Sequence, residues 1–115
     1  MPVEQAHPKA RLRSPGSLIA SQIEALAGNR VTVAMKRERP WASITFAGTR
    51  QSFVIDWQGT AEPDGMHNLA KALPDYEFAI PGYFVADMLV TEQSDLRLLV
   101  EALSIIDPVE KTRNF

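Results

Sequence analysis

The sequence predicts a single α+β domain, a two-layer sandwich in which two helices cover one face of an antiparallel sheet of about six strands. Three observations lead to this fold class. Apolar residues recur three and four positions apart in two segments, which is typical of helices with one buried face. Several short segments alternate apolar with polar side chains, as strands do. The connections between most of these strands are too short for a parallel crossover.

The first helix has clear boundary signals. Ser14 is a favoured N-cap residue, and Pro15 suits the first helical position, where its missing N–H breaks no hydrogen bond. Gly28 tolerates the left-handed backbone conformation that ends many helices. We therefore expect a helix over 15–27.

Three strands should follow this helix. The charged residues 36–40 form the first connection, and Gly48 indicates a tight turn over 47–50. Alternation between the turns is regular enough to predict a meander of adjacent strands. The segments expected as strands are 31–36, 42–46 and 53–57.

A second helix and three further strands should make up the rest of the chain. The helix lies within 60–73, because Pro63 fits only its first turn and Pro74 stops it. The last apolar segment also fits a helix capped by Ser94, but we favour a strand because the preceding strand needs a partner. The segments expected as strands are 76–80, 84–90 and 96–106.

The element order therefore repeats a helix and three strands, first over 15–57 and again over 62–106. Sequence identity between the two units is negligible, so the repeat is one of pattern, and a true duplication stays open. Both helices should lie on the same side of one sheet, because each has one apolar face to bury. The domain covers 14–107, with tails at 1–13 and 108–115. The predicted core contains Leu18, Ile23, Leu26, Val31, Val33, Ile44, Phe46, Phe53, Ile55, Leu69, Leu73, Phe78, Ile80, Phe84, Met88 and Val90.

The composition narrows the function classes. The chain has 115 residues, of which 45% are apolar and none is cysteine, so disulfides, thiolate metal sites and cysteine nucleophiles are excluded. Neither His7 nor His67 has the spacing of a metal ligand, and no nucleotide or hydrolase motif occurs. Without a leader pattern or a long apolar run, we expect a cytoplasmic protein with no cofactor, no metal and no membrane contact.

Charge is divided unevenly between the two units. Residues 1–57 carry eight Lys/Arg and four Asp/Glu, a balance of +4, whereas residues 58–115 carry four Lys/Arg and ten Asp/Glu, a balance of −6. The halves should attract each other within one molecule or between two copies. The alternative is a chance division over a solvated surface.

A basic and aromatic cluster is the most suggestive feature of the first unit. Lys36, Arg37 and Arg39 lie beside Trp41, and Arg50 follows in the next hairpin. Cations near an aromatic ring can bind phosphates and stack bases, which predicts a nucleic-acid site. A solvated turn is the alternative, and the net charge of −2 argues against nucleic acid as the partner.

The uncovered face of the sheet is the second candidate site. A half-apolar face of this kind suits a small ligand or a second copy of the chain. Two of its carboxylates, Asp56 and Asp87, sit inside strands, where aspartate is depleted; with Arg50 they could serve a pocket between the units. The side chains expected on this face are Thr32, Ala34, Ser43, Thr45, Val54, Asp56, Tyr83, Val85, Asp87 and Leu89.

Two segments carry a resemblance. Residues 40–50, Pro-Trp-Ala-Ser-Ile-Thr-Phe-Ala-Gly-Thr-Arg, and 77–87, Glu-Phe-Ala-Ile-Pro-Gly-Tyr-Phe-Val-Ala-Asp, resemble a family of small bacterial proteins, which implies no particular activity. In element order alone, the chain is similar to duplicated ligand-binding modules such as gyrase-inhibitor-like effector domains. Those modules begin each unit with a strand, whereas this chain begins with a helix.

Taken together, these features predict a non-enzymatic binding or interaction module that acts through the open sheet face, with a second copy of the chain as the expected partner. Two alternatives remain: a small-molecule site or enzyme with a pocket between the units, and a nucleic-acid site at residues 36–41. The residues predicted to bind a ligand or partner are Lys36, Arg37, Arg39, Trp41, Arg50, Asp56, Tyr83 and Asp87.

Overall fold

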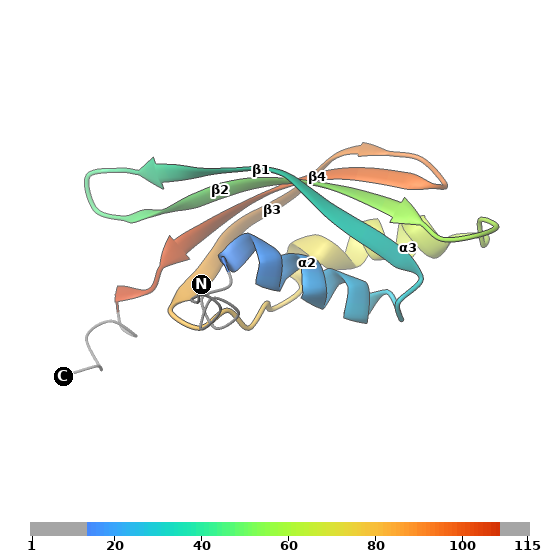
Figure 1. Ribbon diagram of the computed structural model, residues 1–115, viewed down its shortest axis with the longest axis horizontal. Coiled ribbons are helices and arrows are strands. Elements are labelled where there is room, and N and C mark those ends of the chain that lie inside the picture. The colour runs from blue at the N-terminus through green and yellow to red at the C-terminus, as the bar shows by residue number, and fades with distance from the viewer. Residues whose placement is uncertain (1–13, 109–115) are drawn as a thin grey trace, which may run out of the picture.

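The computed structural model describes residues 14–108 and has an α+β fold (Figure 1). Two helices and a short 3₁₀ turn accompany a four-stranded antiparallel sheet. The predicted tail 1–13 and the tail residues after Pro108 lie outside the described residues. In chain order the elements are α2 (Pro15–Leu26), β1 (Val31–Ala42), β2 (Ala47–Trp57), α3 (Gly65–Ala72), η2 (Leu73–Asp75), β3 (Tyr83–Gln93) and β4 (Arg97–Ile106).

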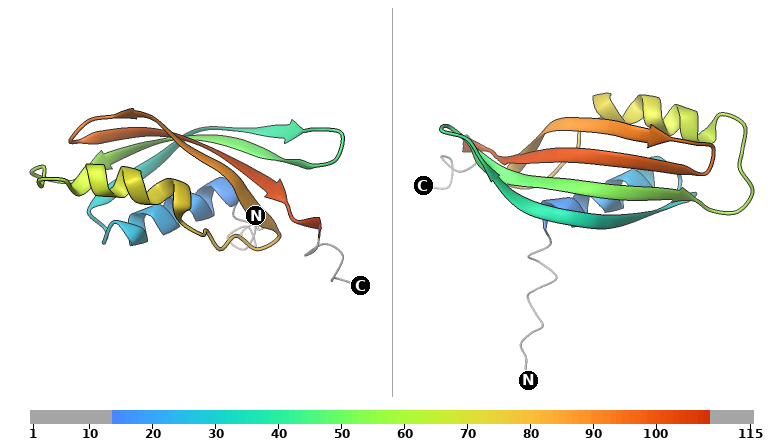
Figure 2. Two further views of the ribbon diagram at one scale, coloured as in Figure 1. Left: turned by 180° about the vertical axis from the view of Figure 1, so that it is seen from behind. Right: turned by 90° about the horizontal axis from the view of Figure 1, so that it is seen from above.

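The sheet has the strand order β1-β2-β4-β3, with every neighbouring pair antiparallel. Both helices cover the same face, as predicted, and no helix formed by residues 14–108 lies on the opposite face (Figures 1 and 2). The prediction of six strands is wrong, because the described residues form four long strands. The order helix–strand–strand occurs twice, in place of a helix and three strands.

The first half has two strands because the predicted break at 36–40 is part of β1. The charged residues 36–40 do not interrupt the strand, because a strand with one uncovered face can carry charged side chains on that face. The turn lies at 43–46, where the Ser43 N–H donates to the Phe46 carbonyl (2.8 Å) and Ser43 Oγ accepts from the Phe46 N–H (3.1 Å). The predicted turn at 47–50 is therefore the beginning of β2.

In the second half, the predicted strand 76–80 is absent from the sheet, apart from one isolated bridge between Ile80 and Tyr83. Its backbone is bound by a helix side chain instead. The Ala79 N–H donates to Gln22 Oε1 (2.9 Å), and the Ala79 carbonyl accepts from Gln22 Nε2 (2.7 Å). The amide of Gln22 thus supplies both hydrogen bonds that a partner strand would have offered. The alternative helix at the chain end is wrong, because that segment is strand β4.

The predicted boundaries of α2 are close to those observed. Ser14 Oγ accepts from the Ser17 N–H (3.1 Å), and Pro15 occupies the first helical position. Helix α3 begins at Gly65, later than its apolar pattern indicated. A Cβ at Gly65 would lie 2.7 Å from the Trp57 ring, so the helix approaches that ring closely at a position that only glycine tolerates without rearrangement.

The core lies between the helices and the covered face of the sheet. Four predicted core residues are exposed instead: Leu26, Ile44, Phe46 and Phe84. Ile44 is at the tip of the β1–β2 hairpin, where nothing packs over it. The other predicted residues are buried or pack against the core. The side chains buried in the main cluster are Ile19, Ile23, Val31, Phe53, Ile55, Met66, Leu69, Ala70, Leu73, Ile80, Met88, Leu98, Val100 and Ala102.

Candidate functional site

The uncovered side of the sheet is identified by the contacts of β1. Glu38 points toward the helices, because its Oε2 accepts from the Gly16 N–H of α2 (3.0 Å). Its neighbours Arg37 and Arg39 therefore point to the other side. The register of the strands aligns the side chains of this open face in five rows. The rows are Thr32–Asp56–Arg97, Ala34–Val54–Leu99–Glu92, Arg37–Ser52–Glu101–Leu89, Arg39–Arg50–Leu103–Asp87 and Trp41–Gly48–Ile105–Phe84.

Three predicted basic residues come together on this face. Arg39 and Arg50 are direct cross-strand partners, and Arg37 lies one row away on β1. Like charges placed directly opposite each other destabilise a strand pair. None of these three guanidinium groups forms an ion pair with any residue from 14 to 108. The predicted Lys36 is the extra residue of a β-bulge, and half-buried Trp41 lies in the row after Arg39.

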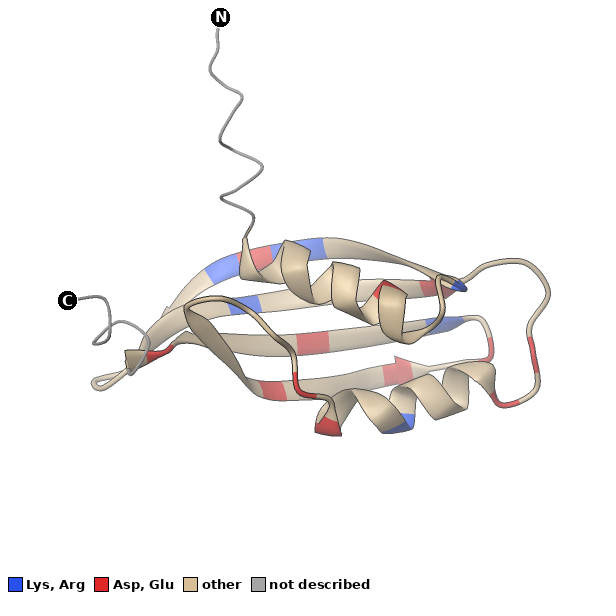
Figure 3. Cartoon of the chain, turned by 90° about the horizontal axis from the view of Figure 1, so that it is seen from below, with Lys and Arg blue, Asp and Glu red and all other residues tan. Residues whose placement is uncertain are grey.

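The other half of the open face is acidic. Glu101 lies on β4, and Asp87 and Glu92 lie on β3. Figure 3 shows where these charges lie along the strands, with blue segments on β1 and β2 and red segments on β3 and β4 across the middle of the sheet. The red segment within β1 is Glu38, whose side chain points to the helices. None of the three carboxylates is ion-paired within the described part of the chain. The face therefore holds two unpaired charge blocks of opposite sign, side by side.

Asp56 is the exception among the predicted site residues, because it is already paired. Its carboxylate accepts from Arg97 Nε (2.6 Å) and from Nη2 of the same guanidinium (3.2 Å), across the β2–β4 pair. The hydrogen bonds from Arg97 lower the pKa of Asp56; burial opposes this shift, and the charges of Arg97 and Lys36 add to it. Asp56 is thus a structural partner of Arg97 and lies three rows from Asp87.

This pair predicts a defined pH dependence. The pKa of Asp56 is lower in the folded chain than in the unfolded chain, so its stabilising contribution is complete above the ordinary carboxyl pKa and is lost as pH falls through the lowered value. In an NMR titration, Arg97→Gln should raise the midpoint of the Asp56 carboxyl. Arg97→Lys should raise it less, because lysine retains the charge but loses the two-pronged geometry. An unchanged midpoint in both variants would contradict this assignment.

Two bulges in β3 correct the predicted face of several residues. The register of β3 against β4 shifts at Ala86 and again at Thr91. Before the first bulge, Tyr83 packs against the covered core, whereas Phe84 points to the open face opposite Ile105. The placement of Tyr83 and Val85 on the open face was therefore wrong, and Phe84 belongs there instead.

Apolar side chains link the two charge blocks. Leu89 is 51% exposed. Phe84 packs edge-on against Phe46 of the opposite hairpin, with the two ring centroids 6.5 Å apart. Leu103 and Ile105 are buried without belonging to the main core cluster. Sequence reasoning missed the residues of β4 because the segment looked uniformly apolar. The spacing of Arg97 and Glu101, four residues apart, is the signal that could have identified its exposed side.

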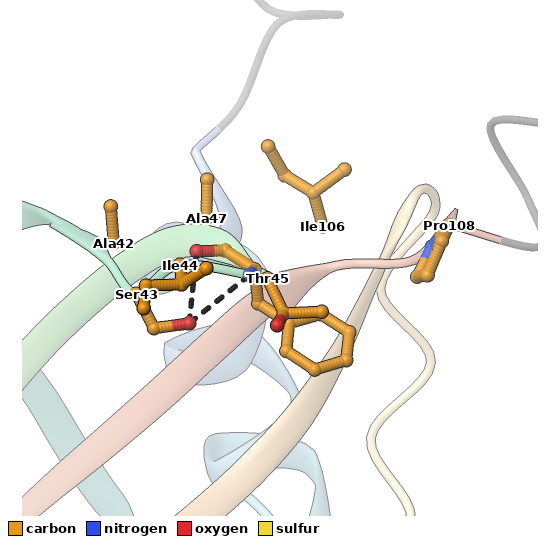
Figure 4. Close-up of a pocket in the computed structure, with 8 residues that line it drawn as sticks. Ala42, Ser43, Ile44, Thr45, Ala47, Ile106 and Pro108 are labelled. Carbon is orange, nitrogen blue, oxygen red and sulfur yellow. Dashed lines mark hydrogen bonds between the residues drawn. The ribbon is translucent and has the colours of Figure 1, made fainter.

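Two surface grooves are lined by none of the charged residues of these two blocks. One, of about 310 Å³, is formed by the hairpin tip 42–47 with Ile106 and Pro108 (Figure 4). Another, of about 500 Å³, lies between the end of α2, Trp57 and α3, beside the ion pair of Arg30 with Glu62. Asp56, Asp87 and Arg50 line neither groove. The structure thus does not bring these three residues into the pocket that the sequence suggested.

From 14 to 108, no three histidine, aspartate or glutamate side chains are grouped so that they could hold a metal ion. Neither helix in the same range has the length and apolar character needed to cross a membrane. Comparison of the chain with protein-family models, with curated proteins and with solved structures found no match.

Proposed function

We propose that this chain is a non-enzymatic interaction module that associates with a second copy of itself through its open sheet face. The observation that carries this proposal is the pair of unpaired charge blocks on one uncovered, partly apolar face. Exposed apolar patches rimmed by polar residues are typical of protein interfaces. The exposed apolar side chains Leu89 and Phe84 would supply the binding energy, and the charges would select the partner.

The size of the face suits this role. Strands lie about 4.8 Å apart and advance about 3.3 Å per residue, so four strands of ten residues present roughly 600 Å² in plan. A standard interface buries about 800 Å² of accessible surface per partner. Accessible area exceeds plan area because side chains stand out from the sheet, so the open face is large enough for a stable contact.

Leu89 provides the first test. Leu89→Lys should weaken self-association by about tenfold or more, because it removes a leucine from the interface and adds a charge to it. Leu96→Lys is the matched control: Leu96 is 49% exposed, close to the 51% of Leu89, but lies in the β3–β4 turn. Sedimentation over a range of micromolar concentrations measures the dissociation constant of each variant.

Two results would contradict the proposal. One is a wild-type chain that stays monomeric at hundreds of micromolar. The other is a dimer that Leu89→Lys and Leu96→Lys weaken equally, which would place the contact outside the open face. Thermal unfolding of both variants controls for a loss of fold.

A second candidate function is the binding of nucleic acid by the basic half of the face. The observation that favours it is the cross-strand pair of Arg39 with Arg50, one row from Trp41. Phosphates would neutralise the guanidinium groups, and a base could stack on the indole ring. Binding of single-stranded DNA by a monomer, weakening steeply with added salt, would support this candidate over the first.

A further inference from the structure

The edges of the sheet are protected against pairing with another strand. The outer strands are β1 and β3. Strand β1 has the Lys36 bulge and Pro40, which offers no N–H, and β3 has bulges at Ala86 and Thr91. Bulges and proline are features that prevent edge-to-edge association. A second copy is therefore expected to approach the open face rather than extend the sheet.

Of the two two-fold axes that pair the open faces with their strands aligned, only one matches the charges of the faces. A two-fold axis perpendicular to the strands, in the plane between the faces, would place β1 over β1 of the other copy. Arg37 and Arg39 would then meet the same arginines of the second copy, and like charges would repel. An axis parallel to the strands, between β2 and β4, places β1 over β3 and β2 over β4, so each basic strand meets an acidic one.

An axis parallel to the strands also places each row of one copy over the same row of the other copy. Arg39 then faces Asp87 of the second copy, because both belong to one row and occupy the two outer strands. In the next row, Trp41 faces the second copy's Phe84. Packed sheets lie about 10 Å apart, and their strand directions differ by about 30°. This angle displaces the outer strands of the two copies from each other, and a long arginine side chain can span the displacement.

We infer that two copies pack face to face about an axis parallel to the strands, with Arg39 of each copy bound to Asp87 of the other. This inference rests on the proposed function and specifies its geometry. It accounts for the position of Arg39 opposite Arg50 without an ion pair to any residue from 14 to 108: the anion comes from the partner. Each guanidinium and carboxylate appears twice, so the contact is self-complementary, as a two-fold interface requires.

Charge reversal tests this geometry. Arg39→Asp sets two carboxylates against each other in both contacts, and Asp87→Arg sets two guanidinium groups against each other. Each variant alone should dimerise at least about tenfold more weakly than wild type. Mixed together, the two variants should form a heterodimer that is tighter than either homodimer, because neither contact of the heterodimer joins like charges, whereas both contacts of each homodimer do.

In the heterodimer, one contact joins the introduced aspartate to the introduced arginine, and the other joins the native Arg39 of one copy to the native Asp87 of its partner. Both contacts therefore join opposite charges, and the affinity should return close to that of wild type. Both side chains are exposed, and in one copy they occupy opposite edges of the sheet, so neither change disturbs folding.

The controls are charge reversals away from the face. Lys71→Asp on α3 and Glu77→Arg before β3 are also exposed, and should neither weaken the dimer nor complement each other. A wild-type dimer that survives Arg39→Asp and Asp87→Arg, or a mixture that fails to associate, would overturn this geometry while the proposed function stands. A wild-type monomer would overturn both, and salt-dependent DNA binding by that monomer, lost in Arg39→Asp, would assign Arg39 to nucleic acid.

Discussion

Gly48→Ala is expected to lower the free energy of unfolding by about 3 kcal/mol, in the upper range for overpacking a folded interior. A Cβ at this position would lie 1.9 Å from the Ser104 carbonyl oxygen and 2.8 Å from Ile105 Cα. Both atoms belong to the backbone of the paired strand β4, so no side chain can rotate away to make room. The clash between the added Cβ and the β4 backbone could be relieved only if β2 and β4 separated, and these two strands join the two halves of the sheet.

The matched control is Gly59→Ala. Gly59 has φ of +78°, which a residue with a Cβ adopts only under strain, but nothing lies within 4 Å of the added atom. It should cost about 1 kcal/mol, from the backbone alone. Urea denaturation measures both variants. Equal losses would contradict the close approach of β4 to Gly48, whereas a clearly larger loss at Gly48 would confirm it.

Gln51→Leu should cost about 2–3 kcal/mol, because it leaves buried polar groups without partners. Gln51 is fully buried, and its amide Nε2 donates to Thr49 Oγ1 (2.7 Å) and to Glu38 Oε2 (3.3 Å). Its Oε1 accepts from Ser104 Oγ (3.3 Å), which is also fully buried. Leucine has a similar volume, so the loss measures the hydrogen bonds rather than a cavity.

A second substitution separates the hydrogen-bond effect from a packing effect. Adding Ser104→Ala to Gln51→Leu should recover about 1 kcal/mol of the free energy of unfolding, because the hydroxyl that lost its acceptor is removed. In the wild-type background, Ser104→Ala should instead be destabilising. If the double variant is less stable than Gln51→Leu, the two side chains are not coupled in the way that the structure indicates.

The helices and the fold class could be predicted because their signals are local. Ser14 and Pro15 stabilise the start of α2 wherever it packs, so the sequence suffices to place it. The number of strands could not be predicted from alternation alone. A charged run breaks a buried strand but not one with an uncovered side, and nothing within 36–40 tells these cases apart. Likewise, the side chain that binds Ala79 is Gln22, far away in the chain.

The candidate site was partly predictable for the same reason. Arg37, Arg39 and Trp41 share a face because they alternate along one strand, and Arg50 joins them through a hairpin. Asp87 and Leu89 of the acidic half lie on the face that alternation predicted. Tyr83 and Val85 do not, since the bulge at Ala86 changes which side chains face outward and leaves no mark in the sequence. The partners of β3 and β4 had to be seen before Phe84 and Tyr83 could be placed correctly.

The central position of β2 and β4 also has a kinetic consequence. Each hairpin joins strands that are neighbours in the chain and can form early, whereas every pair of the β2–β4 ladder joins residues at least 41 positions apart, the separation of Asp56 from Arg97. Closing such a loop costs entropy that only the completed core repays. The slow event in folding is therefore the docking of two helix–hairpin halves along this central seam. Until that event, the apolar sides of both halves remain exposed to water.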